Sequence, residues 1–148
     1  MTGPISSRVA RIAAEGDPAL IASLPSGYAI LNDNQPDAIA GCCVLLPTRV
    51  VPGINDLDSH ARDLFMRDLL LLGDAVLAAT GAERVNYLIL CNIAPELHAH
   101  VIPRYVNEDP VKRKLGPFEA YDFACSRVID PEGEDAGLLE RLRAAIDT

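Results

Sequence analysis

An uninterrupted helical pattern from Ser59 to Thr80 constrains the fold of this chain more than any other feature of its sequence. Asp58 and Ser59 are N-cap candidates, Gly81 stands where a C′ glycine ends a helix, and no proline lies in the segment between Ser59 and Gly81. Apolar residues recur at helical spacing along one stripe: Leu57, Ala61, Leu64, Phe65, Leu69, Leu72, Val76 and Ala79. A helix of this kind has one face to bury, so the rest of the chain must supply an apolar surface for it.

Short β-forming segments on both sides of the helix can supply that surface. YAIL at 28–31 follows Gly27 and stops at the turn-forming NDNQPD, and CCVLL at 42–46 ends at Pro47. Together they predict an antiparallel hairpin. VNYLIL at 85–90 and LHAHVIP at 97–103 predict two more strands after the long helix.

The ends of the chain are less regular. Residues 5–24 have apolar positions that suit one or two short amphipathic helices interrupted by GDP at 16–18, and residues 136–146 suit a C-terminal helix. The polar tail at 106–125 predicts a loop, with a short strand near YDFA at 121–124. The whole pattern predicts an α+β domain with an antiparallel sheet and one long helix packed on it.

Length, composition and charge narrow the function classes. The 148 residues, 49% of them hydrophobic and 23% charged, fit one globular domain spanning 1–148. A net charge of −8 disfavours polymeric nucleic acid and anionic membranes as partners. The longest apolar run is far too short to span a bilayer, and the first thirty residues show no signal-peptide core. We therefore expect a cytoplasmic protein that acts on a small molecule.

The most informative side chains lie in the fourth predicted strand. Alternation places Leu97, Ala99 and Val101 on one face and Glu96, His98, His100 and Ile102 on the other, with the two imidazoles about 6–7 Å apart. Spacing alone leaves three interpretations open. The histidines could be exposed on the wet side of a sheet, they could bind a metal together with the glutamate, or one could be a nucleophile toward phosphorus.

The segment from Glu96 to Arg104, Glu-Leu-His-Ala-His-Val-Ile-Pro-Arg, resembles the signature of the histidine triad (HIT) family. That signature is His-φ-His-φ-His-φ-φ, where φ is apolar, usually followed by Pro-Arg. VNYLILCN upstream, YAILNDNQ with GCCVLLPTRV, and NDLD before the long helix extend the resemblance over about 27–105. Residues 106–148 then form a C-terminal extension of a HIT-like core.

The resemblance implies a role for each matching residue. His98 would attack the α-phosphorus of a nucleotide and form a nucleotidyl-histidine that water hydrolyses, which requires its other ring nitrogen to be held, usually by a backbone carbonyl. His100 would stabilise the phosphate, with Asn92 beside it. The ribose would meet one of Asn32, Asp33 and Asn34, among which register cannot choose. The base would lie against Leu31 and Leu45.

The sequence departs from the family pattern at two positions. Glu96 replaces the first histidine and would bring a negative charge to the phosphate side unless Arg104 or Arg49 neutralised it or it faced solvent; Ile93 replaces a frequent glutamine. A noncatalytic nucleotide sensor therefore stays open beside a hydrolase, as does a metal-binding protein that uses Glu96, His98 and His100, although a fourth ligand is not visible.

The resemblance also implies an oligomeric state, a class of substrate and a cofactor requirement. We expect a homodimer, formed through the long helices or by extension of the sheet. Candidate substrates are dinucleoside polyphosphates, nucleoside phosphoramidates and sugar nucleotides. No cofactor or metal is required for attack by His98, although magnesium can accompany a polyphosphate. The tail contains Lys112, Arg113 and Lys114, which we expect to influence the choice of leaving group or to form a mobile basic loop.

Overall fold

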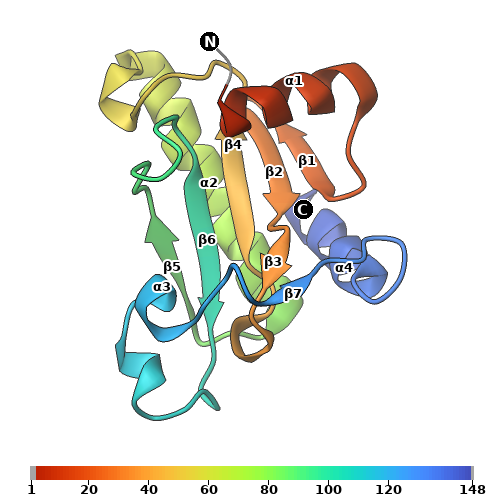
Figure 1. The fold of residues 1–148 in the computed structure, drawn as a ribbon. Coiled ribbons are helices and arrows are strands. Elements are labelled where there is room, and N and C mark those ends of the chain that lie inside the picture. The colour runs from red at the N-terminus through yellow and green to blue at the C-terminus, as the bar shows by residue number, and fades with distance from the viewer. Residues whose placement is uncertain (1–2, 148) are drawn as a thin grey trace.

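The computed structural model describes residues 3–147 and shows a five-stranded antiparallel sheet with helices on both faces (Figure 1), beside a small two-stranded sheet. The five-stranded sheet has the strand order β1-β2-β4-β6-β5, and each strand is antiparallel to its neighbours. Its strands are β1 (Leu20–Leu24), β2 (Gly27–Leu31), β4 (Cys43–Pro47), β6 (Ala99–Arg104) and β5 (Arg84–Leu88). The predicted α+β class with an antiparallel sheet is confirmed.

The long helix α2 (Ser59–Thr80) forms where the sequence predicts it. The Asp58 side chain accepts a hydrogen bond from the Ala61 amide at 2.9 Å, and Gly81 ends the helix in the left-handed conformation, with φ of 71°. Its stripe packs on one face of the sheet together with α4 (Ala136–Ile146), also predicted. The core between them includes Leu31, Leu45, Phe65, Leu69, Leu72, Leu97, Val101, Leu139 and Leu142, so the C-terminal extension contributes to the main core.

The opposite face of the sheet has two separate covers. The helix α1 (Pro4–Glu15) packs on β2 and β4 through Val9 and Ile12, which contact Ile30, Val44 and Leu46. The C-terminal tail covers another part of this face, where Tyr121 and Phe123 pack near Ile39, Cys42 and Ile102. Figure 1 shows α1 and the tail at different ends of this face.

Two predictions about the chain ends are wrong. Residues 20–24 form β1 rather than a second short helix, because their backbone pairs with β2 from Leu20↔Ile30 to Leu24↔Gly27. The short strand of the tail is β7 (Arg127–Val128), which pairs with β3 (Asn34–Gln35), and not a strand near residues 121–124. The tail instead contains a 3-10 turn at Lys112–Lys114 and α3 (Pro117–Ala120). Two further 3-10 turns lie earlier in the chain, at Asp37–Ile39 and Ile54–Asp56.

The loop between β2 and β4 is held by one buried amide. Gln35 donates to the carbonyls of Asn32 and Cys42 and accepts from the amides of Gly41 and Cys42, at 2.9–3.0 Å. Its side chain is 1% exposed and therefore has no access to a ligand. These four bonds fix the conformation of the chain where β2 ends.

No helix among residues 3–147 is both long enough and apolar enough to cross a membrane.

Candidate active site

The strand β6 and the residues just before it place two histidines on the face away from α2. Ala99 and Val101 are fully buried against α2, so His98 and His100 point to the other side, as the alternation predicts. Their ring centroids are 5.1 Å apart, and the ring planes are nearly perpendicular, at 78°. The strand begins at Ala99, two residues later than predicted, so Glu96, Leu97 and His98 lie in the loop before it.

The ring of His98 is held by the backbone. Its Nδ1 lies 2.7 Å from the carbonyl oxygen of Glu96, two residues earlier. Because a carbonyl can only accept, the hydrogen of the neutral ring resides on Nδ1 and the lone pair resides on Nε2. The arrangement therefore selects, for the neutral ring, the tautomer with a bare Nε2, which is the form that a nucleophile requires.

The half-buried ring of His100 lies between His98 and an aromatic side chain of α3. The Phe118 ring lies 4.9 Å from it, centroid to centroid, with an edge-to-face geometry of 76°. Burial first, and then the neighbouring His98, lowers the pKa of His100 to about 4. His100 is therefore neutral at pH 7 and can donate one N–H to a ligand.

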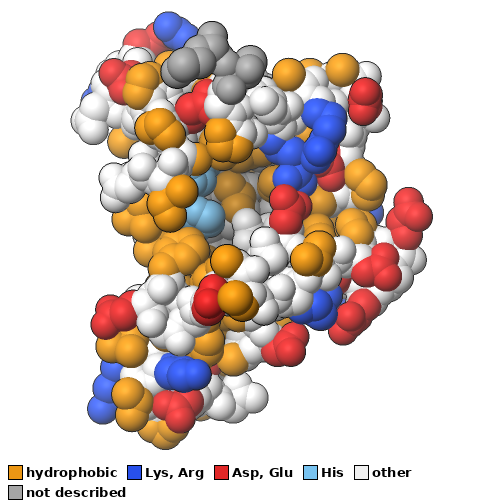
Figure 2. Space-filling view, in the orientation of Figure 1, with side chains coloured by type: hydrophobic (Ala, Val, Ile, Leu, Met, Phe, Trp, Pro, Cys, Tyr) orange, Lys and Arg blue, Asp and Glu red, His pale blue; other side chains and the backbone are white. Residues whose placement is uncertain are grey.

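The two rings line a cavity of about 870 Å³. Figure 2 shows histidine side chains at the back of a hollow on this face, with hydrophobic side chains around it. The loop after β5 and the segment around α3 supply the other lining residues: Leu90, Cys91, Asn92, Ile93, Ala94, Phe118, Glu119, Ala120, Tyr121, Asp122 and Phe123. None of these residues is a lysine or an arginine.

The loop on one side of the cavity starts with an unusual backbone conformation. Cys91 has a φ of 54°, in the left-handed region that costs a non-glycine residue about 1–2 kcal/mol. Its Sγ lies 3.7 Å from the carbonyl oxygen of His98. This turn carries the chain from β5 to the cavity rim, where Asn92 is exposed and Ile93 is 100% exposed.

Of the predicted site residues, the structure brings His98, His100 and Asn92 together around the cavity. Asn32, Asp33 and Asn34 do not line it. The amide of Asn32 donates to the carbonyl of Asn34 at 2.9 Å, and the exposed Asp33 carboxylate pairs with Arg8 of α1 at 2.8 Å.

The predicted contacts between the base and Leu31 and Leu45 are wrong, because both side chains point to the other face of the sheet. Leu31 and Leu45 are fully buried on the α2 face of the sheet. Ile30 and Val44 instead share the histidine face, and the pairings Ile30↔Val44 and Val44↔His100 place all three in one row across the sheet.

Glu96 is also absent from the cavity lining. Its carboxylate accepts hydrogen bonds from the hydroxyl and the backbone amide of Ser6, at the N-terminus of α1. These bonds, chiefly the one from the Ser6 hydroxyl, lower the pKa of Glu96. The carboxylate is thus ionised but turned away from the two rings, and no group of three metal-ligating side chains occurs within residues 3–147.

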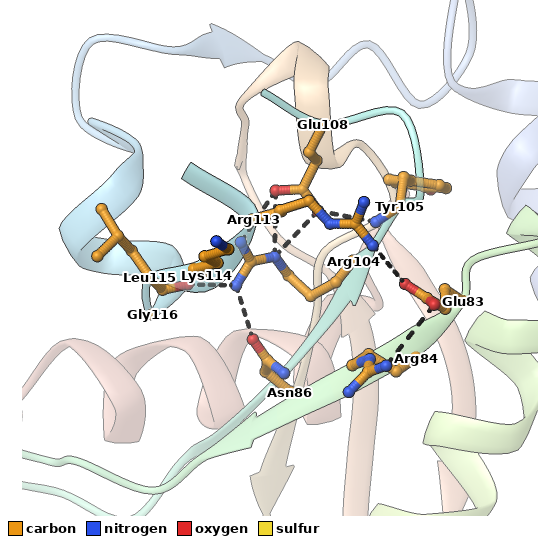
Figure 3. Close-up of a pocket in the computed structure, with 10 residues that line it drawn as sticks. All are labelled: Glu83, Arg84, Asn86, Arg104, Tyr105, Glu108, Arg113, Lys114, Leu115 and Gly116. Atoms are coloured by element: carbon orange, nitrogen blue, oxygen red, sulfur yellow. Dashed lines mark hydrogen bonds and ion pairs between the residues drawn. The ribbon is translucent and has the colours of Figure 1, made fainter. Parts of the chain in front are cut away.

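Neither arginine considered as a partner for Glu96 reaches it. Arg49 is exposed and lies 4.0 Å from Asp58. Arg104 is 5% exposed and lies in the wall of a second cavity, of about 500 Å³ (Figure 3). There its guanidinium makes a double interaction with the Glu108 carboxylate and donates to Asn86 and to the carbonyls of Lys112 and Leu115.

The basic residues of the tail face this second cavity or its surroundings. Arg113 and Lys114 line it, and the ammonium group of Lys112 lies 5.4 Å from the centroid of the Tyr121 ring. Arg113 and Lys114 thus lie at the second cavity, whereas Lys112 packs on Tyr121, a residue that also lines the histidine cavity. The tail contributes an aromatic wall instead, which the sequence analysis missed. Its signal was available: FEAYDF at 118–123 places three aromatic residues within an otherwise polar tail.

Comparisons with known proteins identify the fold. No protein-family model and no curated protein sequence matches the chain. Among solved structures, a histidine triad protein from Sinorhizobium meliloti is 22% identical, with a TM-score of 0.73 and 97% of each chain covered. One from Bradyrhizobium japonicum is 21% identical, with a TM-score of 0.72 and coverage of 86% of this chain and 89% of that one.

A hypothetical histidine triad nucleotide-binding protein from Sulfolobus tokodaii is 16% identical, with a TM-score of 0.71 and coverage of 95% of this chain and 91% of that one. The chain therefore has the fold of histidine triad proteins, as the resemblance of its sequence implies.

Proposed function

Starting from a histidine triad fold, we propose that this chain hydrolyses a nucleotide derivative at its α-phosphate through a covalent nucleotidyl-His98 intermediate. The observation that carries the proposal is the bond from Nδ1 of His98 to the carbonyl of Glu96, which leaves Nε2 free beside a cavity. A structural neighbour described as nucleotide-binding supports a nucleotide as the ligand.

The proposed reaction has two displacements at phosphorus. In the first, Nε2 of His98 forms a bond to the α-phosphorus while the bond to the leaving group breaks, and the leaving group departs with the bonding pair and takes up a proton. In the second, water forms a bond to phosphorus, the bond to Nε2 breaks, and the water proton is released. The products are a nucleoside monophosphate, the protonated leaving group and the restored imidazole.

The neighbouring groups suit the charge that develops on the phosphate. His100 is neutral at pH 7, so its N–H can donate to a phosphate oxygen. The amide of Asn92 can add a second donor from the loop at the cavity rim. Both donors are uncharged, which agrees with an α-phosphate that carries a single negative charge.

The composition of the cavity favours one class among the candidate substrates. A polyphosphate leaving group brings several negative charges, which need nearby cations. The cavity lining has aromatic and aliphatic side chains, two carboxylates in Glu119 and Asp122, and no lysine or arginine. We therefore favour nucleoside phosphoramidates, whose leaving amine is uncharged or cationic, over dinucleoside polyphosphates and sugar nucleotides.

The nucleoside would extend across the sheet from His100 toward the end of β2. Two strand spacings separate β6 from β2, about 10 Å. Val44 and Ile30 lie in this row but are buried beneath Val9 and Ile12 of α1, so the nucleoside would pass along the side of that helix rather than over them. Asp33, with Asn32 and Asn34 beside it, follows β2 at this end and would bind the ribose hydroxyls. Ligand binding there would compete with the ion pair between Asp33 and Arg8.

We further propose that two copies pair along the edge strand β5. This strand ends the sheet, and the exposed apolar side chains of Met66, Leu70 and Tyr87 lie on it or on α2. Light scattering after size-exclusion chromatography tests this: a dimer is expected, and Leu70→Glu should give a monomer. Val128→Glu, at an exposed apolar position on β7, should remain a dimer; a monomeric wild type would contradict the proposal.

Release of AMP from three substrates tests the reaction. Adenosine phosphoramidate, diadenosine tetraphosphate and a sugar nucleotide would each be incubated with wild type, His98→Ala and His60→Ala, with and without magnesium. His60 is exposed in the first turn of α2 and provides the matched control.

We expect AMP release from the phosphoramidate by wild type and His60→Ala and none by His98→Ala. AMP binding measured by calorimetry without any turnover would instead support the noncatalytic sensor. Turnover that survives His98→Ala would contradict the proposed nucleophile.

A further inference from the structure

Glu96 stands at the position of the first histidine in the triad pattern, and its side chain binds the start of α1. The hydroxyl of Ser6 donates to Oε2, and the backbone amide of Ser6 donates to Oε1 at 3.3 Å. The side chain of Glu96 is thus fixed by a helix that lies 90 residues earlier in the sequence.

The helix needs such a partner because its own sequence does not provide one. The N-cap position is Gly3, which has no side chain to accept from the first amides, and the first turn has no acidic residue. A carboxylate at a helix N-terminus satisfies free amides and interacts favourably with the helix dipole. A Cβ at Gly3 would overlap with Oε1 of Glu96, so the absence of a side chain is what admits the carboxylate.

The backbone of the same residue holds the ring of His98. The carbonyl of Glu96 accepts from Nδ1, the amide of Glu96 donates to the carbonyl of Ala94 at 2.8 Å, and the next amide, of Leu97, donates to Val51 at 2.7 Å. Glu96 lies in the loop before β6, outside the sheet ladder, so its carbonyl is oriented by these few bonds and by its anchored side chain.

From these contacts we propose that Glu96 is a positioning residue that connects α1 to His98. Its side chain anchors the loop to the helix, and its carbonyl thereby holds the His98 ring in one orientation and one tautomer. The inference rests on the proposed function for its catalytic meaning, but the tautomer itself is a property of the free protein. The bond to α1 also explains how a glutamate is tolerated next to the proposed phosphate site, because the helix N-terminus offsets the negative charge of the carboxylate.

The experiment uses Glu96→Ala, Glu96→Gln and Ser6→Ala, with Ser7→Ala as the matched control on an exposed neighbouring position of α1. Nitrogen-15 NMR of the imidazoles reports the tautomer of His98 without any substrate. Turnover of adenosine phosphoramidate gives kcat and KM for the same variants. Circular dichroism and urea unfolding establish that each variant is folded.

We expect wild type and Ser7→Ala to show His98 with hydrogen on Nδ1. Glu96→Ala should show a mixture of tautomers and a kcat about 10-fold lower, with KM changed less than about 2-fold. Glu96→Gln keeps an acceptor for Ser6 and should retain most of the Nδ1 tautomer and most of the wild-type kcat. Ser6→Ala should give a tautomer population and a kcat between those of wild type and Glu96→Ala.

A His98 tautomer and a kcat that are unchanged in folded Glu96→Ala would overturn the inference and leave Glu96 as a helix cap only. If wild type shows no turnover but the tautomer changes in Glu96→Ala, the proposed hydrolysis fails while the positioning role stands. If Glu96→Ala does not fold, Glu96→Gln and Ser6→Ala test the inference. A His98 that keeps its Nδ1 tautomer in Glu96→Gln but shows a mixture of tautomers in Ser6→Ala would support a connection from α1 through Glu96 to His98. A His98 that keeps the Nδ1 tautomer in both variants would overturn it.

Discussion

Substitution of Glu108 by glutamine should destabilise the protein strongly, because it breaks a buried ion pair. The Arg104 and Glu108 side chains are both buried, and the carboxylate accepts from Arg104, from the Tyr105 amide and from the Tyr121 hydroxyl. Either orientation of a glutamine amide would point its NH₂ group at one of these donors. The guanidinium would also lose the charge that compensates its own.

The expected loss is about 3–5 kcal/mol in the free energy of unfolding, the range observed when one partner of a buried pair is removed. At roughly 2–4 °C per kcal/mol for a chain of this size, Tm should fall by about 10 °C. Urea unfolding at pH 7 measures the change. Glu132→Gln, at an exposed position, is the matched control and should alter stability by less than about 0.5 kcal/mol.

The pH dependence provides a second signature of the same pair. Burial alone raises the pKa of Glu108, but the bonds from Arg104, Tyr121 and Tyr105 outweigh it and hold the pKa below its ordinary value of 4.5. A lowered folded pKa means that the contribution is complete above pH 4.5 and is lost as the pH falls through the folded value. The difference in the free energy of unfolding between wild type and Glu108→Gln should therefore become smaller below pH 4.5. A loss of less than about 1 kcal/mol in the free energy of unfolding at pH 7, or a difference between the two proteins that stays constant below pH 4.5, would refute this reasoning.

Three further predictions concern single positions. Burial and the adjacent imidazole lower the pKa of His100 from 6.5 to about 4. The unfolded chain therefore takes up a proton at His100 before the folded one does, so the free energy of unfolding should not be reduced by this group above pH 6.5 and should decline as the pH falls toward 4. His100→Gln should remove this decline in urea midpoints measured at pH 7 and pH 5. Gly27→Ala would place a Cβ against a backbone carbonyl of β4 and should cost about 1–3 kcal/mol in urea unfolding, whereas Gly116→Ala, in open space, should change stability by less than about 0.5 kcal/mol. Asp58→Ala removes the N-cap of α2 and should lower Tm by the equivalent of about 1 kcal/mol, an effect that exposed Asp63→Ala should not reproduce.

The parts of the fold that were predictable have local causes. The helix α2 follows from its cap residues and its apolar stripe, and the hairpin of β2 and β4 follows from the turn residues between two apolar runs. The strand β1 was not predictable in the same way. LIASL suits a helix or a strand equally by pattern, and its pairing with β2 decides between them.

In the candidate site, too, the features with local causes were predictable from the sequence and those that depend on distant segments were not. Alternation along β6 was enough to place His98 and His100 on one face, and the carbonyl that holds His98 lies only two residues away. The direction of the Glu96 carboxylate depends on α1, and the position of Phe118 depends on how the tail returns to the sheet. Such contacts join segments that are far apart in the chain, and no local pattern in the sequence specifies them.

The cavity has two structural origins, with consequences for how such a protein can change over evolutionary time. Its floor is formed by His100 in β6 and by His98 directly before it, whereas its wall at 118–123 follows a loop held by Arg104 and Glu108. Replacement of the wall segment need not disturb the bond from Nδ1 of His98 to the Glu96 carbonyl, provided that the contacts of Arg104 and Glu108 are kept. Exchange of the wall segment would therefore change the aromatic side chains that face a ligand and the packing of Phe118 on His100, while the backbone bond that holds the ring of His98 would remain.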